Sequence, residues 1–262
     1  MLDWNQISNA LGESRSKIRC HVVIDCITST NDWSAWSCGN EQLPAICLAE
    51  QQTSGRGRSG REWISPPAEN ICLSLVWPFS VCVNSRLDGL SLVIGVAIAR
   101  VMAVYGIQAK IKWPNDVLVN GDKIAGILIE TKIKPSGDAI AIIGVGINYA
   151  LSELSRLHIG QACCDMASHF KSRISPDRNQ VAGMVIKELI HVCEEFTQYG
   201  FSAFIKDWNH YDVCSGRDVQ VHDASGVWIG KVIGLNDRCG LRVLRNNSEH
   251  VVYAADVSIR IK

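Results

Sequence analysis

The chain has 262 residues, 47% of them hydrophobic, which is enough for one sizeable core and a small second domain. Lysine plus arginine number 26, as do aspartate plus glutamate, so the formal net charge is zero. This balance argues against general nucleic-acid binding, which needs a basic footprint. No apolar run approaches the ~20 residues that span a bilayer, and residues 1–17 lack the apolar stretch of a signal peptide.

The eleven cysteines form an odd, irregularly spaced set without any Cys-x-x-Cys motif. Neither a disulfide framework nor a zinc site fits that pattern. We therefore expect free, buried thiols and a soluble protein in the reducing cytoplasm.

Apolar runs in the first part of the chain predict strands at residues 19–27, 44–50 and 71–77. Between the first two strands, Ser-Thr-Asn at 29–31 offers capping chemistry for a helix over 32–37. The segment 51–70 is polar and interrupts the strand pattern.

Helical spacing of apolar residues predicts a helix over 87–105, closed by Gly106. Asn120-Gly121 between two apolar runs is a strong hairpin signal, and a second turn at 135–137 leads into a strand over 139–150. Because tight turns join these neighbours, we expect a mixed, largely antiparallel sheet.

Residues 177–199 read as an amphipathic helix, and 202–211 as a shorter one. From about residue 216 the chain consists of short alternating strands with Gly or Asn turns, which suggests a small β-barrel. The sequence thus predicts an α+β fold with two domains, at 1–212 and 213–262.

Residues 55–60, GRGRSG, formally satisfy the G-x-G-x-x-G pattern of dinucleotide-binding folds. That interpretation requires a strand before the motif and a helix after it. The strand is predicted, but residues 61–67 have no helical period and end in two prolines. The context therefore argues against a Rossmann site.

What remains is a glycine-rich loop with three arginines, Arg56, Arg58 and Arg61. Glycine lets the backbone approach a ligand closely, and arginine forks suit phosphate and carboxylate oxygens. Taken alone, such a segment can equally be a solvated loop with incidental charge.

The loop belongs to a longer pattern. Its parts are STN at 29–31, AEQQTSGRGRSGREW at 49–63, KWPND at 112–116, KIAGILIE at 123–130 and GVGIN at 144–148. In this order the motifs resemble those of biotin–protein ligases. The resemblance covers residues 22–150 and implies a class II synthetase-like ligase core. From about residue 216, the pattern of short strands and turns is similar to that of the family's C-terminal SH3-like domain.

The resemblance implies an enzyme, a biotin–[acetyl-CoA-carboxylase] ligase. Such an enzyme uses ATP to activate biotin as biotinoyl-5'-AMP, releases pyrophosphate, and transfers the biotin to a specific lysine of a biotin carboxyl carrier protein domain. ATP with Mg²⁺ is then the co-substrate and biotin the substrate, with no permanently bound cofactor.

The resemblance assigns ten residues to biotin: Ser29, Thr30, Asn31, Gln52, Arg56, Gly57, Arg58, Lys123, Gly126 and Leu128. A buried ureido group needs hydrogen-bond partners, because each unpaired polar atom costs ~1–3 kcal/mol. From the residues alone, Ser29 also fits a plain helix N-cap, and Leu128 an ordinary core position.

For ATP and the adenylate, the resemblance implies Arg58, Arg61, Trp63, Lys112, Asn115, Lys123 and Asn148. The reaction joins two anions, the biotin carboxylate and the α-phosphate, whose repulsion cations must neutralise. We expect Lys123 to hold both groups and Arg58 to clamp them. On local sequence alone, Lys123 is equally a solvated hairpin lysine.

Asp116 completes the expected catalytic set, with Lys123 and Arg58. It would orient or deprotonate the incoming lysine amine, which is protonated at neutral pH because its pKa is ~10.4. A turn-forming Pro-Asn-Asp is the structural alternative. No protein cage for a metal is expected; Mg²⁺ would arrive with ATP, close to Asn115.

Some relatives carry an N-terminal helix-turn-helix domain, for which the twenty or so residues before the first strand here are too few. We therefore expect no DNA binding, no membrane contact, and a monomer or homodimer whose partner is the carrier domain.

Three rival interpretations stay open. A lipoate–protein ligase would share the fold and adenylation chemistry but lack the loop in this form. A biotin-binding regulator would not release pyrophosphate. An interaction module built around the C-terminal barrel would leave the motifs unexplained.

Overall fold

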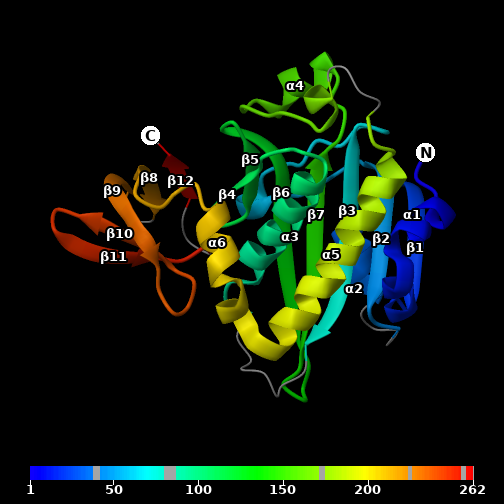
Figure 1. Ribbon diagram of the computed structural model, residues 1–262, viewed down its shortest axis with the longest axis horizontal. Coiled ribbons are helices and arrows are strands. Elements are labelled where there is room, and N and C mark those ends of the chain that lie inside the picture. Colours follow the sequence, from blue (N-terminus) through cyan, green and yellow to red (C-terminus); the bar gives the residue numbers. More distant parts are fainter. Residues whose placement is uncertain (38–41, 80–86, 171–174, 224–225, 255–257, 262) are drawn as a thin grey trace.

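The computed structural model (Figure 1) describes residues 1–37, 42–79, 87–170, 175–223, 226–254 and 258–261. Its centre is a seven-stranded sheet in which only β1 and β2 run parallel. In sheet order its strands are β1 (Cys20–Ile27), β2 (Ala45–Gln52), β3 (Asn70–Phe79), β7 (Ala139–Asn148), β6 (Asp122–Ile133), β5 (Asp116–Val119) and β4 (Lys110–Lys112). The prediction of a mixed, largely antiparallel sheet is confirmed.

Helices cover both faces of this sheet (Figure 1). On one face, α3 (Leu90–Val104) and α5 (Arg178–Tyr199) pack against each other and against the strands, with α1 (Trp4–Leu11) on α5 and α6 (Ile205–Tyr211) on α3. On the other, α2 (Thr30–Ser37) packs on β2, β3 and β7. The last helix, α4 (Glu153–Ile159), follows β7. Short 3₁₀ turns lie at Gly12–Lys17, Arg58–Gly60, Ala167–His169 and Gly200–Phe204.

The helix expected over residues 87–105 begins three residues later than expected, at Leu90. Gly89 precedes it with a φ of 83°, a left-handed conformation that cannot continue into a helix toward Leu87. The helix is buried around most of its circumference, because the sheet, α5 and α6 all pack against it. Likewise α6 begins at Ile205, after a 3₁₀ turn.

The hairpin between β5 and β6 forms at the predicted Asn120-Gly121 turn. Asn120 has a φ of 53° and Gly121 a φ of 92°, as a two-residue hairpin turn of type I′ requires. The second predicted turn, at residues 135–137, joins β6 to β7, and the amide of Gly137 donates to the carbonyl of Lys134. Helices α1 and α4 had no counterpart in the sequence predictions.

The C-terminal part folds as a second, five-stranded antiparallel sheet, in keeping with the expected barrel-like domain (Figure 1). In sheet order its strands are β11 (Ser248–Val252), β10 (Leu241–Arg245), β9 (Gly226–Leu235), β8 (Asp218–Asp223) and β12 (Ser258–Ile261). The indole of Trp113 donates to the carbonyl of Cys239, 3.1 Å away, which ties this sheet to the larger domain. The boundary at residues 212–213 stays a prediction.

A buried ion pair lies at the end of β2. Glu50 and Arg178, the first residue of α5, have side-chain exposures of 7% and 8%, and one carboxylate oxygen of Glu50 lies 2.5 Å from Nη2 of Arg178. The backbone amide of Leu2 also donates to Glu50, and Nη1 of Arg178 donates to the carbonyl of Asn70. The pair therefore joins the chain's first residues to β2, β3 and α5.

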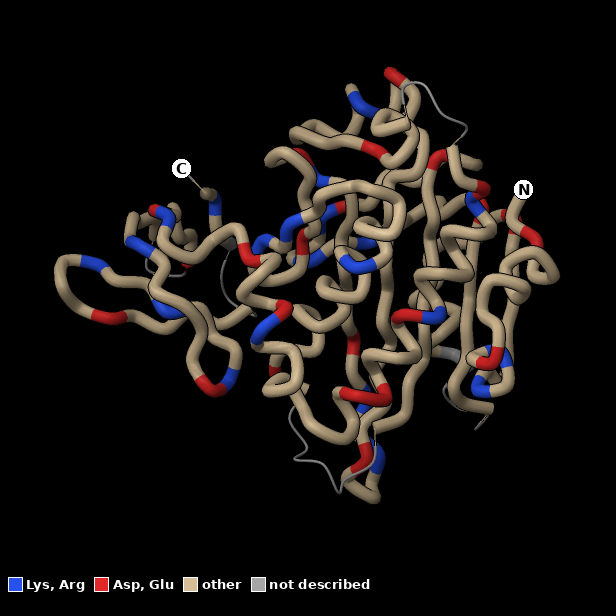
Figure 2. Tube along the Cα trace, in the orientation of Figure 1, with Lys and Arg blue, Asp and Glu red and all other residues tan. Residues whose placement is uncertain are grey.

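The nine cysteines within the described ranges are all free thiols, as expected, but they are not all buried: Cys26 is exposed, and Cys20, Cys163 and Cys164 are half-buried. Burial raises the pKa of Cys47 to about 12, so this thiol stays protonated at neutral pH. In the same ranges, no helix is long and apolar enough to cross a membrane. Lysine and arginine alternate with aspartate and glutamate over most of the trace (Figure 2).

Candidate active site

The floor of the candidate site consists of glycines in the central strands. Gly126 of β6 pairs with Gly146 of β7, and Gly144 pairs with Leu128. A Cβ atom at Gly144 would overlap the carboxamide of Asn31, and one at Gly146 would overlap the indole of Trp63. The missing side chains thus leave a hollow on the sheet face that carries α2.

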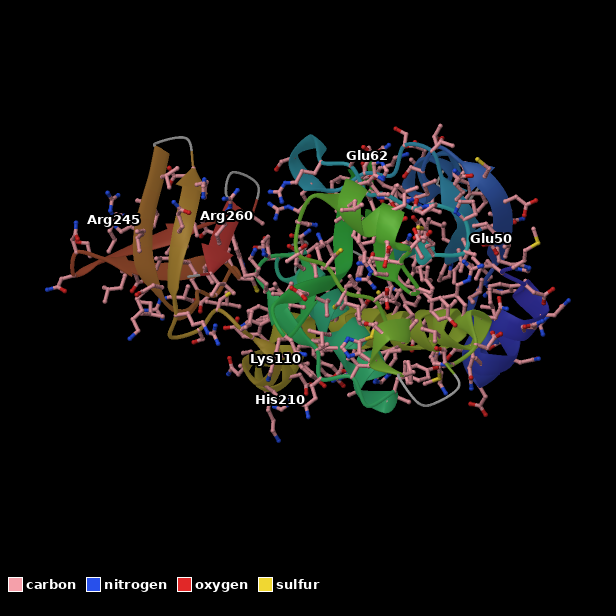
Figure 3. All side chains as sticks on the ribbon, turned by 90° about the horizontal axis from the view of Figure 1, so that it is seen from above. Glu50, Glu62, Lys110, His210, Arg245 and Arg260 are labelled. Atoms are coloured by element: carbon pink, nitrogen blue, oxygen red, sulfur yellow. The ribbon has the colours of Figure 1, made fainter. Side chains whose placement is uncertain are left out.

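One pocket above this floor is lined by all the predicted site residues except Lys112 and Asn148. Its free volume is about 90 Å³. Its wall also contains residues that the sequence did not single out: Glu62, Ile127, Gly144, Val145, Gly146 and Gln161. Figure 3 shows Glu62 on the opposite side of the molecule from Lys110 and His210, and therefore away from α6.

The N-terminus of α2 forms one wall through a hydrogen-bonded cluster. Thr30 donates from its backbone amide to Oε1 of Gln52 at 2.8 Å, and its Oγ1 lies 3.1 Å from the same atom. Ser74, which the sequence did not point to, donates to Oδ1 of Asn31 at 2.6 Å and contacts Oγ1 of Thr30 at 2.7 Å. Ser29 accepts from the amide of Asn31, so it lines the pocket and caps the helix at once.

Two carboxylates hold Arg56. Its Nη1 lies 2.5 Å from Oδ1 of Asp32, and its Nη2 lies 3.3 Å from Oε1 of Glu130. The other oxygen of Glu130 accepts from Nδ2 of Asn31 at 2.7 Å. The hydrogen bond to Asp32 is the strongest influence on Arg56, and the pKa of this guanidinium is raised above its usual range.

Arg58 spans from the loop to the C-terminal sheet. Its Nη1 donates to Oδ1 of Asn115 at 3.2 Å, and its Nη2 donates to the backbone carbonyl of Ala254. Burial lowers its pKa, with a further contribution from Arg61, and Asp116 opposes that shift. The helix that a Rossmann site would need is absent from the described loop, where Arg58–Gly60 form only a 3₁₀ turn.

Lys123 and Asp116 face each other inside the pocket. Nζ of Lys123 lies 2.7 Å from Oδ1 of Asp116 and 5.5 Å from the centre of the Trp63 ring. The same indole covers Gly146, and its Nε1 is buried without a hydrogen-bond partner in the described structure. Trp63 therefore fills part of the hollow that the glycines leave.

The two remaining predicted residues lie beside the pocket. Asn148 donates to the carbonyls of Lys123 and Cys164, at 3.2 and 3.0 Å, and lines a smaller cavity of about 40 Å³ that Lys123 and Trp63 share. Lys112 lies on β4. Burial lowers the pKa of its amine; Asp116 and Cys214 oppose this shift, and the nearby charges of Lys123 and Arg61 add to it.

The arrangement favours an anionic ligand. Burial lowers the pKa of both Arg58 and Lys112, and neighbouring cations add to this effect, although Asp116 opposes it at both residues. A bound anion would relieve both effects by restoring charge balance in a space of low dielectric. The hydroxyls and amides of the α2 wall line the same pocket as Arg58 and add neutral donors and acceptors. The pocket can therefore hold a ligand with a polar head and an anionic end.

Comparison with known proteins bears on the identity of this ligand. Residues 23–148 match the model of the biotin/lipoate A/B protein ligase family. The chain is 35% identical over 201 residues to the bifunctional ligase/repressor BirA of Escherichia coli strain K12, across 76% of this chain and 61% of that relative. It is 35% identical over 156 residues to a biotin–[acetyl-CoA-carboxylase] ligase of Mycobacterium tuberculosis, across 55% and 52% of the two chains.

Among solved structures, the fold is similar to that of the biotin protein ligase from Aquifex aeolicus in complex with biotin and ATP. That likeness has a TM-score of 0.75 and 23% identity, and covers 93% of this chain and 100% of that one. The chain thus spans about 61% of the length of the first curated relatives it matches. Over residues 23–148 it is similar to the biotin/lipoate A/B protein ligase family.

Proposed function

We propose that this protein is a biotin–[acetyl-CoA-carboxylase] ligase. It joins biotin to ATP as biotinoyl-5'-AMP with release of pyrophosphate, and then transfers the biotin to a specific lysine of a biotin carboxyl carrier protein domain. The observation that carries this proposal is that the five motifs of the pattern, which are separate along the chain, meet in one pocket. The match of residues 23–148 to the family model and the names of the relatives support it.

In this proposal, biotin lies on the glycine floor with its ureido ring toward the α2 wall. Ser29, Thr30 and Gln52 offer that ring donors and acceptors, and Leu128 and the backbone of Gly126 contact its apolar part. Asn31, whose carboxamide covers Gly144, closes the end of the hollow. Arg56 and Gly57 lie beside the valerate chain of biotin.

Activation brings two anions together, and the proposal gives that task to the cations of the pocket. The carboxylate oxygen of biotin attacks the α-phosphorus of ATP, and the bond to pyrophosphate breaks. Lys123 lies between the two anions and lowers their repulsion, with Arg58 on the carboxylate and phosphate oxygens. Arg61 and Lys112 neutralise the pyrophosphate side, Trp63 lies near the adenine, and Asn148 bonds the adenylate.

Asp116 has the second task. The acceptor amine attacks the carbonyl carbon of the mixed anhydride, and AMP leaves. Because that amine is protonated at neutral pH, a carboxylate that orients it and accepts its proton promotes attack. Asp116 pairs with Lys123 at 2.7 Å, so it lies within reach of the carbon that Lys123 holds. No permanently bound cofactor is needed, and Mg²⁺ enters with ATP, close to Asn115.

The volume of the pocket implies a movement. Its free volume of about 90 Å³ is below the ~300–1,000 Å³ usual for small-molecule sites, because Trp63 and the arginine side chains occupy the hollow. We propose that the segment 55–63 carries these side chains outward to admit biotin and returns over the adenylate, where it excludes water.

Incubation with ATP, Mg²⁺, biotin and a carrier domain tests the proposal, with the carrier's mass as readout. A gain equal to one biotin, absent without ATP, is expected. Lipoate in place of biotin separates the two activities of the family, since a gain with lipoate alone would make the protein a lipoate ligase. Binding of biotin without pyrophosphate release would make it a regulator instead.

A further inference from the structure

A short segment after α4 runs beside Lys123. The backbone amide of Lys123 donates to the carbonyl of Ala162 at 3.1 Å, and the amide of Cys164 donates to the carbonyl of Lys123 at 3.0 Å. These two bonds form an isolated parallel bridge between Lys123 and Cys163. Residues 162–164, the clamp segment, therefore hold the backbone from which the side chain of Lys123 extends.

The sheet holds Lys123 less regularly on its other side. There Leu118 of β5 lies opposite Lys123, and the register of the β5–β6 pair shifts between Val117 and Leu118. Such an irregularity disrupts the local ladder of hydrogen bonds. Nζ of Lys123 lies 2.7 Å from Oδ1 of Asp116, at the end of a flexible stem whose reach depends on where its backbone is fixed. The clamp segment thus supports Lys123 where the ladder is irregular.

The clamp segment lies outside the described helices and strands, so side chains hold it in place. One of them is Asn148, at the end of β7. Its Nδ2 donates to the carbonyl of Cys164 at 3.0 Å and to that of Lys123 at 3.2 Å, and so bridges the segment and the lysine. A second is Arg156 of α4, whose Nη1 donates to the carbonyl of Cys163 at 3.4 Å.

Arg156 also reaches the segment through a buried carboxylate. Its Nη2 pairs with Oδ2 of Asp165, whose side chain is only 3% exposed. Asp165 follows the clamp segment directly, and it accepts from the amides of Leu151 and Ser168 at 2.9 and 2.8 Å. A carboxylate buried to this degree needs its cation, because a buried charge without a partner is strongly destabilising. Removal of the guanidinium would therefore force Asp165, and the segment attached to it, to move.

The start of α4 is attached to the rest of the domain independently of Arg156. This helix lies beyond the end of the central strands (Figure 1). The amide of Ser152, the residue that caps the helix, donates to Oε2 of Glu69 at 3.0 Å. A variant at Arg156 should therefore leave the helix in place, so that an effect on Lys123 can be separated from loss of α4.

We propose that Arg156 is a positioning residue for the activation step. Through Asp165 and the carbonyl of Cys163 it fixes the clamp segment. The clamp segment in turn fixes the backbone of Lys123, so that the ammonium group faces Asp116 inside the pocket. Arg156 is not among the described residues that line the pocket, and it acts through these groups alone. The kinetic role rests on the proposed ligase activity, whereas the structural link from Arg156 to Lys123 does not.

Amide hydrogen exchange tests the structural link. The amides of Lys123 and Cys164, which close the bridge, should be protected in the wild type and exchange ~10-fold faster in Arg156→Met. The amide of Ile127, on the same strand, donates to the carbonyl of Asn115 and should keep its rate, which excludes a general loosening of β6. Unchanged rates at Lys123 and Cys164 would overturn the proposal. Because this measurement needs no ligase activity, it separates failure of the inference from failure of the proposed function.

Biotin-dependent exchange of pyrophosphate into ATP tests the kinetic role. In Arg156→Met we expect kcat to fall ~10-fold with the KM for biotin unchanged, because the α2 wall proposed to bind biotin is untouched. Arg156→Lys keeps a cation for Asp165 and should recover most of the rate. Leu157→Ala, at an 80% exposed position of the same helix, is the matched control and should keep the wild-type rate.

A double variant separates positioning from a general structural effect. If Arg156 acts through Lys123, adding Arg156→Met to Lys123→Met should lower the exchange rate no further. A general defect of the fold would instead lower the rate by the same factor in both backgrounds. That outcome, or a rise in the KM for biotin with kcat unchanged, would exclude a positioning role for Arg156.

Discussion

The Nζ atom of Lys123 lies 2.7 Å from Oδ1 of Asp116, and this ion pair joins the two strands of the β5–β6 hairpin inside the pocket. Side-chain exposures of 16% and 18% place it in a partly desolvated space. The pair therefore brings the cation proposed for activation next to the carboxylate proposed for transfer, so the two proposed half-reactions would share one position.

Replacing Lys123 by methionine should abolish most of the activation step, because in the proposed mechanism Lys123 is the cation that lies between the two reacting anions. We expect biotin-dependent exchange of pyrophosphate into ATP to fall ~10²–10³-fold, as when one stabilising group of a transition state is lost. Lys132→Met is the matched control: this lysine lies on the same strand but is exposed and bonds the carbonyl of Ala35. Equal exchange rates in the two variants would contradict the proposed role of Lys123 in activation.

Arg58→Ala should let the adenylate escape, because the side chain links the loop to Asn115 and to the C-terminal sheet at Ala254. In a single turnover with labelled biotin, the fraction of adenylate released before transfer should rise. Arg245→Ala, which removes an arginine from the ring of Trp228 in the C-terminal sheet, should leave this fraction unchanged. Unchanged retention in Arg58→Ala would rule out a closing role for the loop.

Gly146→Ala should destabilise the fold through Trp63. The new methyl group would overlap the indole, and overpacking of this kind costs ~1–3 kcal/mol. Truncating Trp63 to alanine removes the group that the new methyl would overlap. The double variant should therefore lose less unfolding free energy than the sum of the losses in the two single variants. Urea unfolding of all four proteins measures this coupling. Simple additivity would show that the ring does not rest on Gly146.

The buried pair of Glu50 and Arg178 should contribute strongly to stability. Arg178→Met leaves a buried carboxylate without its partner, which costs ~3–5 kcal/mol. Replacing both residues by apolar ones, as in Glu50→Leu/Arg178→Met, should cost much less, since no charge is then buried alone. Denaturant unfolding at neutral pH compares the variants, and equal losses would contradict this account.

The same pair predicts a dependence on pH. Burial alone would raise the pKa of Glu50, but the hydrogen bonds from Arg178 and Leu2 and the charge of Arg178 outweigh it, and the pKa is lowered. The folded state thus binds the proton less tightly than the unfolded one. This stabilisation is present above the unfolded pKa of ~4.3 and is lost as pH falls through the folded value. Glu50→Gln should show a smaller loss of stability over that acidic interval, measured by urea unfolding.

Local patterns in the sequence were sufficient for much of the fold. The Asn120-Gly121 turn, the strands of the main sheet and α5 follow from periodicity and turn chemistry, which act between near neighbours. The start of α3 was misplaced because the left-handed conformation of Gly89 leaves no periodic signal. Helices α1 and α4, of eight and seven residues, were missed because so few residues carry little periodicity.

The predicted site was less complete, because a motif names residues without their neighbours. Ser74, Asp32 and Glu130 hold the predicted Thr30, Asn31 and Arg56, yet no spacing in the chain connects them. The alternation of glycines in GVGIN was the one available signal for the floor, since residues two apart in a strand share a face. Its meaning depends on Gly126, which comes from another strand.

The sequence by itself determined that an arginine–glycine loop, a KWPND motif and a GVGIN strand occur in the order typical of biotin–protein ligases, and that the loop lacks the helix of a Rossmann site. Only the tertiary structure decided that Lys123 meets Asp116, that Arg58 reaches Ala254 almost two hundred residues away, and that Lys112 and Asn148 stand beside the pocket. The reason is physical: periodicity and turn chemistry act along the chain, whereas ion pairs and packing act between residues that only the complete fold brings together.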